Sequence, residues 1–141
     1  MSGFDAFDKA LHKAHEWLKE ISGQLGENTT DQQAYAAMRG VLRALRDRLT
    51  PVEAAQLAAQ LPVLVRGIFY ESYDPGRTPL KIRHRDEFLD LVRLHMGNID
   101  NVEPEAAARA VFAVLQRHVS AGEIDDVLAE MPGEIRNLLA A

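Results

Sequence analysis

The stretch LPVLVRGIF (residues 61–69) returns later in the chain as MPGEIRNLL (residues 131–139). Each copy has a proline at its second position and an arginine four residues after that proline. A proline inside a helix removes a hydrogen bond and clashes with the preceding turn, at a cost of about 3 kcal/mol, but it is well tolerated at a helix start. Pro62 and Pro132 therefore predict a corner after which a short helix begins, near 62–70 and near 132–140.

The similarity extends outward from these two stretches with a constant offset of 70 residues. Residues 36–66 and 106–136 align without gaps, and nine of the 31 pairs are identical, among them Glu53/Glu123, Pro62/Pro132 and Arg66/Arg136. Many of the remaining pairs exchange one apolar side chain for another. A fixed offset of this kind indicates an internal duplication.

The segments before the two prolines also read as helices. Thr30 is a plausible N-cap, with Gln33 three residues later, for a helix that runs to about residue 49. The stretches TPVE (residues 50–53) and SAGE (residues 120–123) begin the next helix in each half, with Thr50 or Ser120 as N-cap and a glutamate that reaches back to the backbone. This capping role explains the paired glutamates without any catalysis.

The N-terminal segment has a single apolar stripe. Phe4, Leu11, Leu18 and Leu25 are spaced by seven residues, which is typical of one face of a helix. We expect this helix over about residues 4–22, ended by the glycines that follow.

The fold predicted from these patterns is all-α, with no strand. It has two pseudo-repeated units of about four helices each, residues 1–70 and 86–141, joined by a connector over residues 71–85 and packed as one compact helical body.

Composition excludes several classes of site. The chain has no cysteine, so disulfides, thiolate metal sites and cysteine nucleophiles are excluded. A net charge of −5 is poorly suited to a phosphate backbone, which argues against nucleic-acid binding. No secretory signal and no apolar run of the ~20 residues that a membrane helix needs is evident. We expect a cytoplasmic protein without a membrane segment.

The connector has no counterpart in the second half, so packing needs shared by both halves do not explain it. It combines aromatic rings with cations, a composition enriched at interfaces. The candidate interaction residues are Tyr70, Glu71, Tyr73, Arg77, Lys81, Arg83 and Arg85. Of these, we expect Tyr70 to be mainly structural, with Tyr73 and Arg77 more exposed. The alternative is a solvated linker whose tyrosines seal the two halves together.

The residues from 42 to 90 resemble an uncharacterised bacterial family of unknown function. The matching features are Arg46 to Leu49 at a helix end, an Ala-Gln-Leu-Pro corner at 59–62, Arg66-Gly67, and an aromatic connector from Tyr70 to Tyr73, where Ser72 and Tyr73 stand in place of the family's usual Gly and Trp. The resemblance implies a duplicated all-helical fold over nearly the whole chain. It implies no activity.

Residues that suggest chemistry have simpler structural explanations. His12, His15 and Glu16 are weak metal candidates, because metal-binding helices usually place two histidines four residues apart, and we expect no metal site there. A structural role, as helix caps or as solvated surface charges, explains the acids Glu123, Asp125, Asp126, Glu130 and Glu134. Arg66 is a tentative ligand residue, although bonding to carbonyls at a helix end is the favoured role.

We therefore expect no catalytic residue and no cofactor, and an enzyme is disfavoured. The favoured function is a non-catalytic helical interaction module whose partner is another protein or a second copy of itself. Two alternatives stay open: a nucleic-acid-associated regulator that uses the basic connector, and a small-ligand or metal-binding protein or enzyme with a site near the connector.

Overall fold

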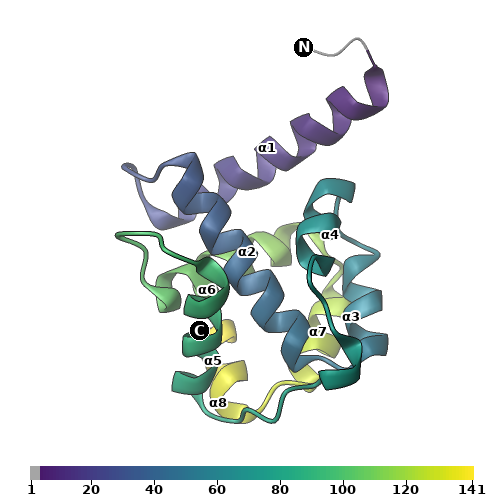
Figure 1. Cartoon of the computed structure of the whole chain (residues 1–141), viewed down its shortest axis with the longest axis vertical. Helices are drawn as coiled ribbons and strands as arrows, with labels where there is room; N and C mark the ends of the chain where they lie inside the picture. The colour runs from purple at the N-terminus through teal and green to yellow at the C-terminus, as the bar shows by residue number, and fades with distance from the viewer. Residues whose placement is uncertain (1–3) are drawn as a thin grey trace.

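A computed structural model describes residues 4–141, and in this part of the chain the fold is all-α (Figure 1), as predicted. No strand is present among these residues. The helices are α1 (Asp5–Leu25), α2 (Asp31–Arg48), α3 (Pro51–Ala58), α4 (Val63–Tyr70), α5 (Arg85–Met96), α6 (Pro104–His118), α7 (Ala121–Ala129) and α8 (Gly133–Ala140), with a 3-10 turn η1 (Pro75–Arg77) between α4 and α5. No helix among the described residues is both long and apolar enough to cross a membrane.

The N-cap residues of α2, α3 and α7 are the predicted ones. Thr30 forms a full capping box with Gln33 at the start of α2. Thr50 and Ser120 accept hydrogen bonds from the backbone N–H groups of Glu53 and Glu123 at the starts of α3 and α7. The two predicted proline corners are confirmed, since α4 begins directly after Pro62 and α8 directly after Pro132.

Helix α2 lies at the centre of the body and buries most of its length. Its closest neighbour is α5, and α1, α4 and α6 also pack against it. Gly40 is where α2 and α5 come together: a Cβ added there would meet the Met96 side chain and would lie 2.9 Å from the Val92 carbonyl oxygen. The absence of a side chain at Gly40 therefore sets the distance between the two helices.

We predict that Gly40→Ala destabilises the protein by about 1–3 kcal/mol, because the added methyl group overpacks the contact between α2 and α5. Gly67→Ala in α4 is a matched control, since nothing lies within 4 Å of its added Cβ. The control should be neutral or slightly stabilising. Thermal or urea unfolding measures both changes. Equal effects for the two variants would show that the close approach at Gly40 is not important.

Helix α1 is longer than expected and leaves the body at its N-terminal half (Figure 1). Gly23 lies inside the helix, and the helix ends before Gly26, which has φ 129°. The buried side chains of α1 are Trp17 and Ile21, both in its C-terminal half. Trp17 stacks on the His118 ring of α6, with 4.9 Å between ring centres. Burial of one half anchors the helix and allows the other half to project.

Candidate functional site

The connector is fastened to the C-terminal end of α2. Arg46 is buried, and its Nη1 donates hydrogen bonds to the carbonyl oxygens of Phe69 at 2.7 Å and Glu71 at 2.6 Å. Its guanidinium also lies over the Tyr73 ring, 5.4 Å from the ring centre. Arg48 Nε donates to a connector carbonyl in the same way, at 2.9 Å. These contacts satisfy connector carbonyls that would otherwise lack donors, so much of the connector has a structural role.

The two connector tyrosines differ from the expectation. Tyr70 is exposed, whereas Tyr73 is half-buried and packs against the core. The Tyr73 hydroxyl lies 3.4 Å from the Thr78 hydroxyl within the connector. The expected order of exposure for these two rings was therefore wrong, because Tyr73 packs under Arg46 and against the core.

The connector's charged side chains are dispersed. Arg77, Lys81 and Arg83 are exposed. Arg85 pairs with an acidic side chain, Glu105 of α6. Glu71 pairs at 2.6 Å with an arginine of α2. The structure therefore does not gather the candidate residues of the connector around one common point.

A hollow of about 250 Å³ lies beside the connector, and Arg46, Asp47 and His95 in its wall already pair with one another. Asp47 accepts hydrogen bonds from Arg46 Nε at 3.0 Å and lies 2.9 Å from His95 Nε2. Burial alone would raise the pKa of Asp47, but the hydrogen bonds from His95 and Arg46 outweigh it and lower that pKa below its usual value. This network joins α2 to α5 and to the connector, and it has the features of a structural ion network.

The other candidate ligand residues, Arg66 and the histidines of α1, do not form a site in the described part of the chain. Arg66 donates to the carbonyl oxygens of Ala58 at 2.9 Å and Leu61 at 2.8 Å, which is the carbonyl-bonding role favoured from the sequence. His12 lies 3.0 Å from Glu16, one turn further along α1. His15 is exposed and joins no cluster of potential metal ligands among the described residues.

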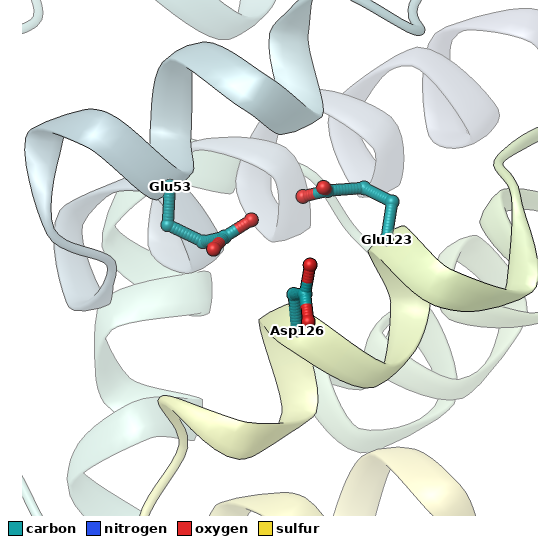
Figure 2. A group of neighbouring side chains, drawn as sticks. All are labelled: Glu53, Glu123 and Asp126. Carbon is teal, nitrogen blue, oxygen red and sulfur yellow. The ribbon is translucent and has the colours of Figure 1, made fainter.

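A group of three carboxylates lies where α3 packs against α7. Glu53 projects from α3, and Glu123 and Asp126 project from α7 toward the same point (Figure 2). One oxygen atom of each carboxylate lies within 4.8 Å of one oxygen of each of the others. Glu53 is 9% exposed and Glu123 is 7% exposed, whereas Asp126 lies on the solvent side. Within residues 4–141, this is the one grouping of three or more acidic or histidine side chains close enough to share an ion.

The electrostatics of this carboxylate group are unfavourable if all its members are ionised. Burial, followed by a hydrogen bond with Glu53 and the charges of Glu53, Asp126 and Glu130, raises the pKa of Glu123 from 4.5 to about 8. Neither Glu53 Oε2 nor Glu123 Oε2 has a hydrogen-bond partner among the described residues, although both atoms are buried. A positive species, a proton or a cation, is therefore needed between the two glutamates at neutral pH.

The predicted reach of the Glu53 and Glu123 side chains back to the N-cap backbone was wrong, because the N–H groups of Thr50 and Ser120 donate to Glu130 and Gln60 instead. The backbone N–H groups of Glu53 and Glu123 complete the predicted N-caps, but their carboxylates face each other across the interface. The sequence held a usable signal, because the two glutamates are separated by the same offset of 70 as the other paired residues.

The comparison with protein families matches residues 14–138 to the family described as "Uncharacterized conserved protein (DUF2267)". The chain belongs to the DUF2267 family. A comparison with curated proteins finds no match. In this DUF2267 chain, the three carboxylates lie inside the matched residues, whereas Phe7 and Leu11 of α1 precede them.

The projecting half of α1 in this DUF2267 protein carries apolar side chains toward solvent. Phe7 is 63% exposed and Leu11 is 42% exposed, and the Phe4 and Phe7 rings meet edge to face with 4.9 Å between their centres. We call Phe7 and Leu11 the α1 stripe. Phe7, Leu11 and Leu18 lie on one face of α1, and Leu18 packs against the core.

A groove of about 470 Å³ lies between the projecting half of α1 and the corner that precedes α4. It is lined from α1 by Ala6, Ala10 and Trp17 and from the corner by Leu61 and Pro62, with further polar side chains at its edge. We call it the Trp17 groove. The α1 stripe lies outside this groove and is apolar surface that the chain does not cover itself.

Proposed function

We propose that this protein is a non-catalytic helical interaction module that self-associates through the projecting half of α1. The observation that carries the proposal is the α1 stripe, two large apolar side chains held in water on a helix whose other half is anchored in the core. Exposed apolar groups on a rigid helix are typical of helix-mediated association.

A second copy of the chain is a chemically suitable partner for this surface. The first turns of α1 carry Asp5 and Asp8, and the following turns carry Lys9, Lys13 and His15. Asp5 pairs with Lys9 and Glu16 with Lys13 inside the same helix, which leaves the apolar side chains to join two antiparallel α1 helices. Such an antiparallel pair places Phe7 of one copy against Leu11 of the other, so the stripe is complementary to itself.

The amount of available apolar surface fits a modest dimer. A fully covered phenylalanine buries about 150–250 Å², but Phe7 is 63% exposed and Leu11 is 42% exposed, so the stripes of two copies supply an apolar contact of roughly 400 Å². Such an area lies below that of stable specific complexes. We therefore expect weak, reversible association that depends on protein concentration.

We also infer that the chain is an internal duplication. In support, α4 and α8 span residues 63–70 and 133–140, which are offset by 70 at both ends. The contacts between the halves are also reciprocal: Thr50 pairs with Glu130, and Ser120 pairs with Gln60. The offset of 70 matches Thr50 to Ser120 and Gln60 to Glu130.

The inferred duplication bears on function because α5 begins at residue 85, which corresponds to residue 15 of α1. The projecting residues 5–14 of α1 thus correspond to connector residues 75–84, which form no long helix. Because the second half has no equivalent helix, the projecting turns of α1 are not required for the packing that the two halves share. An interaction role for these turns is therefore better supported than one for the connector, which is fastened to α2.

The proposal is tested by measuring mass as a function of concentration with light scattering or sedimentation. We predict that the wild type forms a dimer and that Leu11→Glu weakens the dimer about 100-fold, because two copies each lose one buried leucine. The melting temperature of the dilute Leu11→Glu variant should be nearly unchanged, as for most surface substitutions.

Leu94→Glu is the matched control, because Leu94 is an exposed leucine of α5 that lies outside the α1 stripe and the Trp17 groove. It should retain the wild-type association. A wild type that stays monomeric at high concentration, or a Leu11→Glu variant that associates like the wild type, would refute the proposal.

A further inference from the structure

The carboxylate group between α3 and α7 presents only oxygen atoms. Glu53 and Glu123 enter it from opposite helices, and Asp126 lies one helical turn beyond Glu123 on the same face of α7 (Figure 2). No histidine is among its members. Oxygen-only ligand sets suit hard cations such as Ca²⁺ and Mg²⁺, whereas zinc and copper prefer nitrogen or sulfur.

The surroundings of the three carboxylates add negative charge. Among the described residues, no ion pair involves Glu53, Glu123 or Asp126. Glu130, at the end of α7, adds a further negative charge that acts on Glu123. Glu130 is itself held by Thr50, whose backbone N–H and hydroxyl both donate to it at 2.9 Å. The packing of α3 against α7 thus keeps the acidic groups together although their charges repel.

Two buried oxygen atoms inside the carboxylate group lack a partner. Glu53 and Glu123 are more than nine-tenths buried, and the Oε2 atom of each has no hydrogen-bond partner among the described residues. Both side chains are directed into the group (Figure 2). Unpaired buried polar atoms are costly, so this arrangement indicates that a ligand completes it.

The spacing allows one ion to contact all three carboxylates, and the flexible coordination of Ca²⁺ suits such a site better than the strict geometry of Mg²⁺. Ca²⁺ forms bonds of about 2.3–2.6 Å to oxygen in variable arrangements, whereas Mg²⁺ requires octahedral geometry with bonds of about 2.0–2.1 Å. Asp126 is exposed, so water can complete the coordination from the solvent side.

We infer that Glu53, Glu123 and Asp126 form a divalent-cation site that binds Ca²⁺ in preference to Mg²⁺ and that joins α3 to α7. Neither the family match nor the proposed self-association assigns this site. The ion supplies the positive charge that two buried carboxylates require. Its binding stabilises the folded chain, because the unfolded chain does not hold the three ligands together.

The test uses the full chain, stripped with EDTA and dialysed at pH 7.5, with CaCl₂ and MgCl₂ as the probes. Isothermal titration calorimetry should give one Ca²⁺ site per chain with weaker binding of Mg²⁺. The melting temperature should rise saturably, by about 10 °C when Ca²⁺ is at 100 times its Kd. Glu123→Gln should abolish both responses, and Asp126→Asn should weaken them without loss of folding.

Asp125→Asn is the matched control, because Asp125 is an exposed acid on α7 outside the carboxylate group. It should bind Ca²⁺ like the wild type. No heat and no shift in melting temperature with 10 mM of either salt would overturn the inference and leave a shared proton as the only occupant. Equal loss of binding in Asp125→Asn and Asp126→Asn would also overturn it, since that result indicates non-specific attraction to acidic α7.

Discussion

Replacing Arg46 with methionine should lower the free energy of unfolding by about 3–5 kcal/mol, because removal of one partner leaves buried polar groups without donors. The wild-type guanidinium serves the carbonyl oxygens of Phe69 and Glu71 and the carboxylate of Asp47. Methionine fills a similar volume but donates no hydrogen bond. Urea unfolding at neutral pH measures the change.

Two further variants serve as comparisons for the Arg46→Met measurement. Arg77→Met makes the same substitution at an exposed connector position and should change stability by no more than about 0.5 kcal/mol. Arg46→Lys keeps the charge but not the planar set of donors, so it should lie between the other two. An Arg46→Met variant as stable as Arg77→Met would show that the connector does not depend on its attachment to α2.

Glu123→Gln should stabilise the protein at alkaline pH when EDTA removes divalent cations. Because the pKa of Glu123 is raised from 4.5 to about 8, the folded chain retains a proton that the unfolded chain has lost between these pH values. The free energy of unfolding of the wild type therefore falls as pH rises through this window and levels off above it. The loss from this group is on the order of 3 kcal/mol between pH 5 and pH 9.

The glutamine variant removes this titration, since its amide can donate to Glu53 at any pH. It should match the wild type near pH 5 and exceed its stability at pH 9 by on the order of 3 kcal/mol. Asp125→Asn should follow the wild-type pH dependence. Chemical unfolding at several pH values tests the prediction, and a Glu123→Gln variant less stable than the wild type at pH 9 would contradict it.

The sequence predicted the parts of this structure that depend on local chemistry. The proline corners at Pro62 and Pro132 and the N-caps at Thr30, Thr50 and Ser120 lie where expected, because each depends on a residue's own backbone geometry or on a partner three positions away. Arg66 bonds to carbonyl oxygens at the preceding corner for the same local reason.

Features that depend on how distant elements pack were not predicted. The direction of the Glu53 and Glu123 carboxylates is set by the crossing of α3 and α7, which no local pattern specifies. The attachment of the connector likewise depends on Arg46. Its position at a helix end did not indicate that it would bond to the distant carbonyl oxygens of Phe69 and Glu71. The interaction surface that we propose therefore lies on α1, whereas the sequence analysis placed it in the connector.

The proposed self-association through α1 is tested most directly by hydrogen exchange of the wild-type protein at low and high concentration. The account predicts that backbone amides of residues 8–14 are weakly protected in the dilute protein and become protected as concentration rises. Amides of residues 18–25, already anchored by the core, should not change. Protection of residues 8–14 that is the same at both concentrations would contradict the account.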